Sequence, residues 1–353
     1  MRRLLDRILR PGYHSSATIW AVLVLLIVLV SLVVPEFILP ANVANVLIQL
    51  VPLGIASLGQ HFVIIGGGID LSIGPLISLV TVALSSLAGA SPLTVAGAIV
   101  LCLCVGGIFG TANGVLAHYV RIPPLIVTLC TGYIIQGIAF AFHETTGGFV
   151  PSGLRDVLTA SWGLLSVPLL LYVLFLLGSG FLLSRAPYGR ALYALGGNEE
   201  VLYASGVRVA RVRIGSYLAA GLLAAVAGIY LAVRLKSGSS HYGDGYALST
   251  ISAVVVGGTS IAGGAGSLPG TVAGTIIVSM LNNVLNNVSF RFGLQSSFYK
   301  FPMLTVKTIS KPSVVRYGQY GPRECADCFL KCRHYIETNE IRRLVQQQRM
   351  RTR

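Results

Sequence analysis

No set of residues in the first 288 positions has the spacing that a known catalytic or metal-binding motif requires. Gly66-Gly67-Gly68 is rich enough in glycine to suggest a phosphate-binding loop, but it lacks the lysine and the G-x-x-x-x-G-K-[ST] spacing of such loops. An H-E-x-x-H pattern and a nucleophile elbow are also absent. The sequence therefore predicts a protein that is not an enzyme and whose body holds no metal and no cofactor.

Two groups of polar residues stand out in the otherwise apolar body. Asp70 is the only acid between Glu36 and Glu144. An acid inside a membrane segment is a candidate ion or proton site, but the position of Asp70 favours an N-cap for the helix that follows it. Asn282, Asn283, Asn286 and Asn287 lie on one face of a helix. That stripe either bonds to a neighbouring helix or lines a polar path.

The composition shows what kind of elements carry these residues. The 353 residues are 54% hydrophobic and only 11% charged, and the mean hydropathy is +0.76. Soluble domains contain about 25% charged residues. Residues 71–120 and 245–290 contain no Asp, Glu, Lys or Arg, and a membrane span needs about 20 apolar residues. The chain is therefore predicted to be an all-α integral membrane protein, a polytopic helical bundle.

Apolar runs separated by Pro, Gly and polar clusters predict nine spans. They are expected at residues 17–34, 46–65, 75–90, 93–117, 125–142, 163–183, 214–233, 247–262 and 267–288. An N-terminus in the cytoplasm leaves Arg155, Arg234 and Lys236 outside. It places ten arginines inside, in agreement with the positive-inside rule: Arg2, Arg3, Arg7, Arg10, Arg121, Arg185, Arg190, Arg208, Arg211 and Arg213.

Two glycine-rich breaks occupy comparable positions in the two halves of the chain, which predicts an internal repeat. Matched breaks of this kind indicate helices interrupted beside a solute path, whereas two tight cytoplasmic turns are the simpler interpretation. The first break includes Gly67, Gly68, Asp70, Ser72 and Gly74, and the second includes Gly257, Gly258, Thr259, Ser260, Gly263 and Gly264.

The loop 184–213 is the largest cytoplasmic segment and is predicted to contain a short helix. Asn198 can cap its N-terminus, where Glu199 and Glu200 would be favourable, and Gly206 can end it. Spacing alone leaves two roles open for Gly196, Gly197, Asn198, Glu199, Glu200, Ser205 and Gly206. The loop is either a solvated connector or a docking element for a cytoplasmic partner.

Several segments together resemble the monosaccharide ABC permeases of the ribose, xylose, galactose and autoinducer-2 type. They are Gly67-Gly68-Ile69-Asp70-Leu71-Ser72-Ile73-Gly74, Asn113-Gly114, Arg121-Ile122-Pro123-Pro124-Leu125-Ile126-Val127-Thr128-Leu129, Gly189-Arg190, Gly196-Gly197-Asn198-Glu199-Glu200, Ser205-Gly206-Val207, Gly257-Gly258-Thr259-Ser260, Gly263-Gly264, Gly266-Ser267 and Asn282-Asn283. Their order matches that family, and the resemblance covers roughly residues 15–288.

The resemblance implies the permease subunit of an importer in the bacterial inner membrane. Expected partners are a second permease copy (identical or paralogous), cytoplasmic ATPase subunits that bind the ATP, and a periplasmic sugar-binding protein, but no nucleic acid. It also implies that the loop around Gly196 and Asn198 couples to the ATPase. Alternatives are an ABC permease for a nucleoside or a branched-chain amino acid, and an ion-coupled secondary transporter that uses Asp70.

Residues 289–353 depart from the family, which ends with a tenth apolar helix. This segment carries 13 Lys or Arg and 4 Asp or Glu, and no run in it is apolar enough to span a bilayer. The division is therefore a permease domain at 1–288 and a divergent basic tail at 289–353. A frameshift is favoured by the abrupt change of composition. A genuine tail and a small metal site at Cys325, Cys328 and Cys332 are the alternatives.

Overall fold

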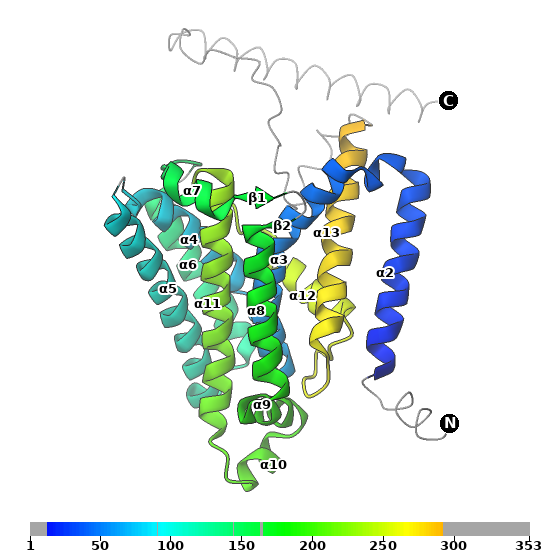
Figure 1. Ribbon diagram of the computed structural model, residues 1–353. Coiled ribbons are helices and arrows are strands. Elements are labelled where there is room, and N and C mark those ends of the chain that lie inside the picture. The colour runs from blue at the N-terminus through cyan, green and yellow to red at the C-terminus, as the bar shows by residue number, and fades with distance from the viewer. Residues whose placement is uncertain (1–12, 90, 144, 163–164, 292–353) are drawn as a thin grey trace, which may run out of the picture. The chain divides into compact units, whose positions relative to one another are not determined.

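The computed structural model describes residues 13–89, 91–143, 145–162 and 165–291 (Figure 1). Most of these residues are helical, and one short antiparallel hairpin pairs β1 (Ser161–Trp162) with β2 (Leu165–Ser166). The expectation of an all-α membrane protein is confirmed for this part of the chain. The expectations for the N-terminal arginines, for the frameshift and for the cysteines of the tail concern residues outside the described ranges.

A helix lies at each of the nine places where a span is expected. The long helices are α2 (Tyr13–Val33), α3 (Pro40–Ile65), α4 (Ile73–Leu87), α5 (Pro92–Val115), α6 (Pro124–Phe142), α8 (Val167–Ser184), α11 (Val209–Leu235), α12 (Tyr246–Val256) and α13 (Leu268–Arg291). Shorter elements join them, namely the 3-10 turn η1 (Pro35–Ile38), the π-helical turn η2 (Leu116–Val120), α7 (Ser152–Leu158), α9 (Pro187–Gly197) and α10 (Glu199–Ala204).

Within the described residues, six helices are long and apolar enough to cross a membrane: α3, α5 with η2, α6, α8, α11 and α13. α4 has 15 residues and α12 has 11, so they rise about 22 and 16 Å at 1.5 Å per residue. The apolar core of a bilayer is about 30 Å thick. The expectation that the spans at 75–90 and 247–262 cross completely is therefore not confirmed. The second of them ends early because Gly257 terminates α12.

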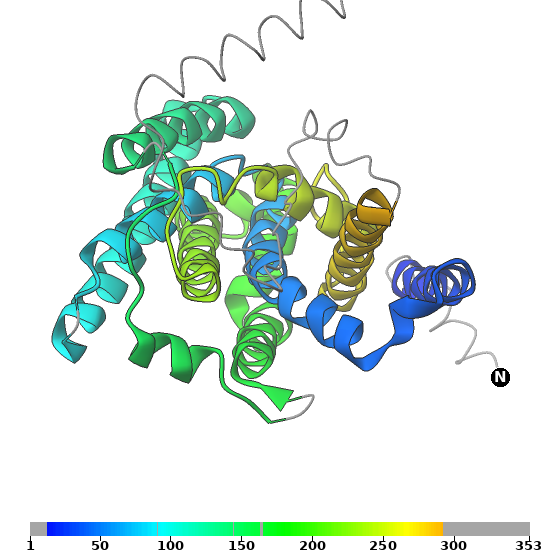
Figure 2. The same ribbon diagram turned by 90° about the horizontal axis from the view of Figure 1, so that it is seen from above.

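Helix α11 packs against α3, α4 and α5 (Figure 2). Helices α11 and α5 approach closely because glycines lie at their contact. A Cβ atom built on Gly106 would lie 2.5 Å from the carbonyl oxygen of Gly221, and one on Gly114 would lie 2.7 Å from Cα of Ile214. Small residues at intervals of four are typical of close helix packing in membranes.

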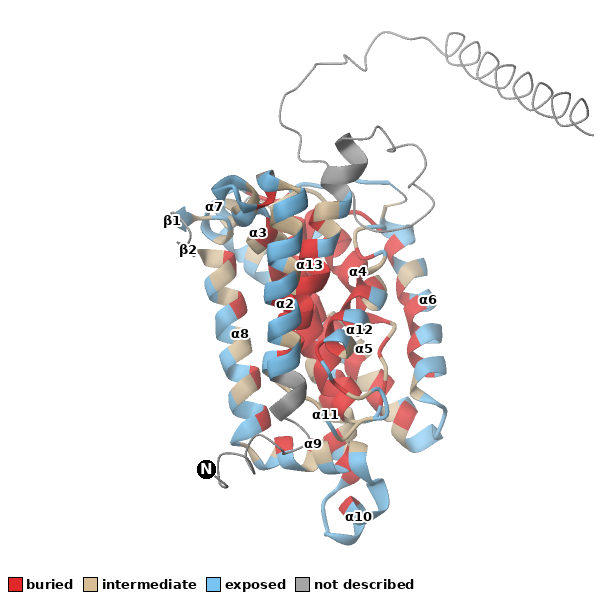
Figure 3. Ribbon diagram, turned by 90° about the vertical axis from the view of Figure 1, so that its right-hand side faces the viewer, coloured by how far each residue is buried: buried red, intermediate tan, exposed pale blue. Residues whose placement is uncertain are grey.

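Figure 3 shows which parts of the helices are exposed and which are buried. Many large apolar side chains are exposed, and the buried residues include many polar ones. Leu32 of α2, Ile108 of α5 and Leu177 of α8 are exposed, while Gln60 and His61 of α3 are completely buried. This distribution is the reverse of that in a soluble protein, in which large apolar patches are covered. The chain is therefore a multi-pass integral membrane protein.

The two glycine-rich breaks begin with the same helix-ending geometry. After α3, Gly67 has φ 79° and the N–H of Gly68 donates to Val63 O. After α12, Gly258 has φ 83° and the N–H of Thr259 donates to Val254 O. This is the Schellman ending, in which one residue adopts a left-handed conformation that favours glycine. Each break therefore ends one helix and leads into the next, from α3 to α4 and from α12 to α13.

Candidate functional site

The two breaks meet each other and the end of α9 at one point, which we call the glycine junction (Gly67, Gly196, Gly263 and Gly264). The N–H of Gly264 donates a 2.9 Å hydrogen bond to Ile65 O, which joins the end of α3 to the second break. A Cβ atom on Gly263 would lie 2.8 Å from Cα of Gly67 and 2.9 Å from Cα of Gly196. Three segments distant in the sequence therefore pack backbone to backbone, which only residues without a side chain permit.

Helix α9 is fixed to this junction by its own side chains. Leu192 is completely buried and lies over Gly66. The Tyr193 hydroxyl donates to Gly266 O at 3.1 Å, and burial raises the pKa of that hydroxyl, so it keeps its proton at neutral pH. The Tyr188 hydroxyl donates to Val212 O in α11. Sequence reasoning missed α9, although a proline at the start and two glycines at the end are signals for it.

Helix α10 has the boundaries expected from its capping residues. The side-chain oxygen of Asn198 accepts a hydrogen bond from the N–H of Val201 at 3.1 Å, and Glu199 and Glu200 lie in the first turn. Ser205 is the C-terminal cap, and Gly206 follows with φ 81°. The predicted short helix is therefore confirmed.

The position of α10 suits contact with another molecule. It projects beyond the end of the bundle that also holds α9 and the start of α2 (Figure 1). The Tyr203 side chain is 76% exposed, and Val201 is exposed beside it. Glu199 forms an ion pair with Arg213 of α11 at 2.5 Å, which ties this helix to the bundle.

Asp70 does not cap α4, contrary to the preferred interpretation of its position. Ser72 occupies the N-cap position. Asp70 lies two residues before it, is only 1% exposed and forms a turn with Ser72. Its Oδ1 atom accepts from the N–H of Ser72 at 2.8 Å and from the Ser72 hydroxyl at 2.6 Å. The prediction was wrong by two residues because an Asp side chain can equally bond to the backbone two positions ahead in a turn.

The hydrogen bonds of Asp70 continue into two other family-like segments. The Asn113 amide donates to the Ser72 hydroxyl at 2.8 Å, and the Thr131 hydroxyl donates to Asn113 Oδ1 at 2.7 Å. Thr128 accepts from the N–H of Leu71 at 3.1 Å. We call Asp70, Ser72, Asn113 and Thr131 the Asp70 network. It connects the first break to α5 and α6, and its extent explains why those segments carry polar residues at these positions.

The remaining residues of the breaks pack against α3, α11 and α13. The hydroxyls of Thr259 and Thr271 lie 3.4 and 2.8 Å from Nδ1 of the buried His61, a residue that sequence reasoning did not single out. The N–H of Ser260 donates to Ala265 O and closes the second break into a loop. Gly257 lies against Gly270 of α13, and Gly68 lies beneath the Tyr217 ring.

The asparagine stripe is described only in part. Asn283 is buried and Asn282 is half-buried on α13. The side chains of Asn286 and Asn287 are outside the described residues, so the expectation of a continuous polar face stays a prediction.

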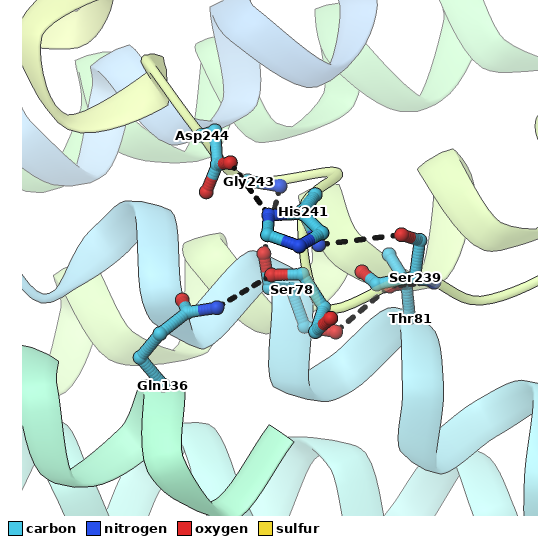
Figure 4. A network of polar contacts seen from close by, with 8 residues as sticks. Ser78, Thr81, Gln136, Ser239, His241, Gly243 and Asp244 are labelled. Carbon is cyan, nitrogen blue, oxygen red and sulfur yellow. Dashed lines mark hydrogen bonds and ion pairs between the residues drawn. The ribbon is translucent and has the colours of Figure 1, made fainter. Parts of the chain in front are cut away.

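Residues 236–245, which sequence reasoning assigned to an outside loop, return into the bundle beside α4; we call them the re-entrant segment (Figure 4). The Thr81 hydroxyl donates to Ser239 O at 3.1 Å, and the N–H of Gly243 donates to the Ser78 hydroxyl at 2.8 Å. Gly74 and Gly243 touch. The segment thus fills the space beside α4 that a longer α12 would occupy.

Comparisons with known proteins give a consistent result. Residues 42–306 match the family model described as "Branched-chain amino acid transport system / permease component". The chain is 36% identical over 260 residues to the ribose import permease protein RbsC of Bacillus subtilis, covering 71% of this chain and 78% of the relative. It is 32% identical to the L-arabinose ABC transporter permease protein AraH of Azospirillum brasilense, covering 73% and 76%. It is 34% identical to the autoinducer 2 import system permease protein LsrD of Photorhabdus temperata, covering 62% and 68%. No solved structure matches the chain.

Proposed function

Because the chain belongs to the family of permease components of branched-chain amino acid-type transport systems, we propose that it is the membrane-spanning subunit of an ATP-driven importer for a monosaccharide. The relatives described above are permeases for ribose, arabinose and autoinducer 2. The solutes named for these relatives favour a sugar or a sugar-like solute over an amino acid or a nucleoside. The protein would act in the bacterial inner membrane as one of two permease subunits.

The observation that carries this proposal is the glycine junction. ATPase subunits would dock from the cytoplasm onto α9 and the exposed α10 and would bind the ATP themselves. Because Gly196 touches Gly263, and the bond from Gly264 to Ile65 O holds the two breaks together, a displacement of α9 moves both breaks at once. The helices joined at these breaks would then rock between outward-open and inward-open arrangements, as alternating access requires. A periplasmic binding protein would deliver the sugar at the opposite end.

An ion-coupled transporter that uses Asp70 is the second candidate function. An ion site needs carboxylate oxygens that are available to the ion, but Oδ1 of Asp70 is already bonded to two donors of Ser72. The Asp70 network therefore favours a structural role, which agrees with the proposal of an ATP-driven importer.

Reconstitution tests the proposed function directly. The full chain is placed in lipid vesicles with its ATPase and its sugar-binding protein, and uptake of labelled ribose, arabinose and leucine is measured. We expect uptake of a sugar that requires ATP and the binding protein and that survives collapse of the proton and sodium gradients. Uptake that needs no ATPase and stops when the gradients collapse would overturn the proposal.

A further inference from the structure

The re-entrant segment carries polar side chains to the middle depth of the bundle. Ser78 of α4, which holds Gly243, is nine residues from the outer end of that helix at Leu87. At 1.5 Å per residue this places Ser78 about 14 Å below the outer end of α4. That is close to half of the ~30 Å apolar thickness of a bilayer. The segment therefore descends along α4 from its outer end to about this depth, which it reaches at Gly243.

Two ionisable side chains of the segment, those of His241 and Asp244, are exposed between the level of Ser78 and the outer end of α6. Nδ1 of His241 and Oδ2 of Asp244 form a 2.9 Å ion pair or hydrogen bond, and the two side chains are 57% and 45% exposed. The Phe140 ring of α6 lies edge-on to the His241 ring with centroids 5.3 Å apart. The Gln136 amide reaches from α6 to Ser240 O at 2.6 Å (Figure 4). This face combines aromatic and polar groups from two elements.

Exposure in the middle of a membrane protein has to be toward water or toward another protein surface. A carboxylate that faces lipid at the bilayer centre is strongly unfavourable, and such residues face the bundle interior or a water-filled cavity. Non-helical backbone at membrane depth is likewise tolerated only where it is buried in protein or lines such a cavity. Both rules apply to the re-entrant segment, because residues 236–245 contain Asp244 and lie outside the helices. The exposed face of His241 and Asp244 therefore borders an aqueous path.

The chemistry of this face suits a neutral, hydroxyl-rich solute. A carboxylate accepts hydrogen bonds from hydroxyls, and an imidazole can donate or accept one. The exposed ring of Phe140, which lies beside His241, offers apolar surface for the C–H groups of a sugar ring. An anionic solute would be repelled by Asp244.

The backbone beneath these side chains is held firmly, as a binding position requires. Ser239 exchanges hydrogen bonds with Thr81, and its hydroxyl accepts from the N–H of His241 at 3.3 Å. Gly243 is bonded to Ser78 and packs against Gly74. The segment therefore presents His241 and Asp244 from a fixed support on α4.

We propose that His241 and Asp244, with Phe140 beside them, bind the hydroxyl groups of the transported sugar in the outer half of the membrane. This inference rests on the proposed function, because it takes the solute to be a sugar. It makes the re-entrant segment a site that selects the solute inside the permease, in addition to any selection by the binding protein.

Uptake kinetics in the reconstituted importer test the role of these side chains. Asp244→Asn should raise the KM for sugar uptake by about tenfold, the effect of losing one hydrogen bond to a charged group. The ATPase activity stimulated by the binding protein should persist in this variant. Phe140→Leu should also raise KM. Matched controls are Asp156→Asn on α7 and Phe142→Leu on α6, both exposed positions outside the segment, which should leave KM unchanged.

Cysteine labelling tests the aqueous path without requiring transport. In a chain whose native cysteines are replaced by alanine, His241→Cys should react with a water-soluble thiol reagent, and added sugar with the binding protein should slow the reaction. A cysteine at exposed Leu177 of α8 is the lipid-facing control and should not react.

The outcomes separate this inference from the proposed function. Sugar uptake by the wild-type importer, with unchanged KM in Asp244→Asn and no labelling at position 241, would overturn the inference and leave the function standing. Absence of ATP-driven sugar uptake in the wild-type chain would overturn the function. Labelling that sugar does not slow, together with unchanged KM, would show that this face meets water without binding the solute and would also overturn the inference.

Discussion

The carbonyl oxygen of Ile65 accepts a 2.9 Å hydrogen bond from the N–H of Gly264, so the last turn of α3 and the loop before α13 are joined through their backbones. Gly196 at the end of α9 covers this bond, because an added Cβ atom would collide with both Ile65 O and Gly264 N. The position leaves no space for a side chain. A movement of α9 is therefore passed directly to the two breaks, because their contact is made by backbone atoms and no rotatable side chain lies between them.

A methyl group at Gly196 should therefore separate α9 from the breaks. We expect Gly196→Ala to abolish sugar uptake, because either the bond between Gly264 and Ile65 opens or α9 moves away. ATPase stimulation by the sugar-loaded binding protein should be lost as well, and both are measured in reconstituted vesicles. Gly197→Ala is the matched control, since a Cβ atom there meets nothing within 4 Å. Equal uptake by the two variants would contradict the role of the junction.

A second glycine contact should control folding rather than coupling. Gly106→Leu places a large side chain where 2.5 Å separates an added Cβ atom from Gly221 O, so α5 and α11 must part. We expect a loss of about 1–3 kcal/mol of stability, the range for overpacking, and a lower melting temperature in detergent. Gly97→Leu on the same helix faces open space and should leave the melting temperature unchanged. A melting temperature for Gly106→Leu equal to that of the control would contradict this packing.

Much of this architecture could be predicted from the sequence, because hydropathy reports where a helix meets lipid. Apolar runs located all nine long helices, and the cap at Asn198 located α10. Hydropathy does not report depth, however, so the half-length α4 and α12 were taken as complete spans. The sequence signal for α12 ending early is Gly257, but glycine is also common inside membrane helices.

The site was harder to predict than the fold. The re-entrant segment was assigned to an outside loop because it lies between the spans predicted at 214–233 and 247–262. Only its tertiary contacts with α4 place it inside the bundle. The sequence singled out the glycines of the junction as parts of two breaks and of a loop expected to be cytoplasmic. Their meeting at one point could not be predicted, because spacing within a segment contains no information about which distant segments touch.

The Asp70 network makes a prediction that separates structure from ion coupling. Asp70→Ala removes the acceptor of two Ser72 hydrogen bonds in a buried place, which should cost about 1–3 kcal/mol and lower the melting temperature. Asp70→Asn keeps an acceptor oxygen of the same size, so it should be more stable than Asp70→Ala and should still transport sugar. Uptake is measured with and without ion gradients. A stable Asp70→Asn variant that has lost uptake would instead support an ion site.

Removal of the Asn198 cap should weaken the binding of the proposed ATPase partner to helix α10. With six residues it has few hydrogen bonds of its own, and the side chain of Asn198 supplies one at its N-terminus. Asn198→Ala should weaken this helix by about 1 kcal/mol, a large share of its stability because isolated short helices are marginal. The exposed surface of Val201 and Tyr203 would then no longer be presented to the ATPase. We expect the ATPase to dissociate from Asn198→Ala during purification of the complex, while Asn198→Asp, which also caps helices well, retains it. Dissociation from both variants would show that the asparagine amide itself contacts the ATPase, and retention by both would contradict docking through α10.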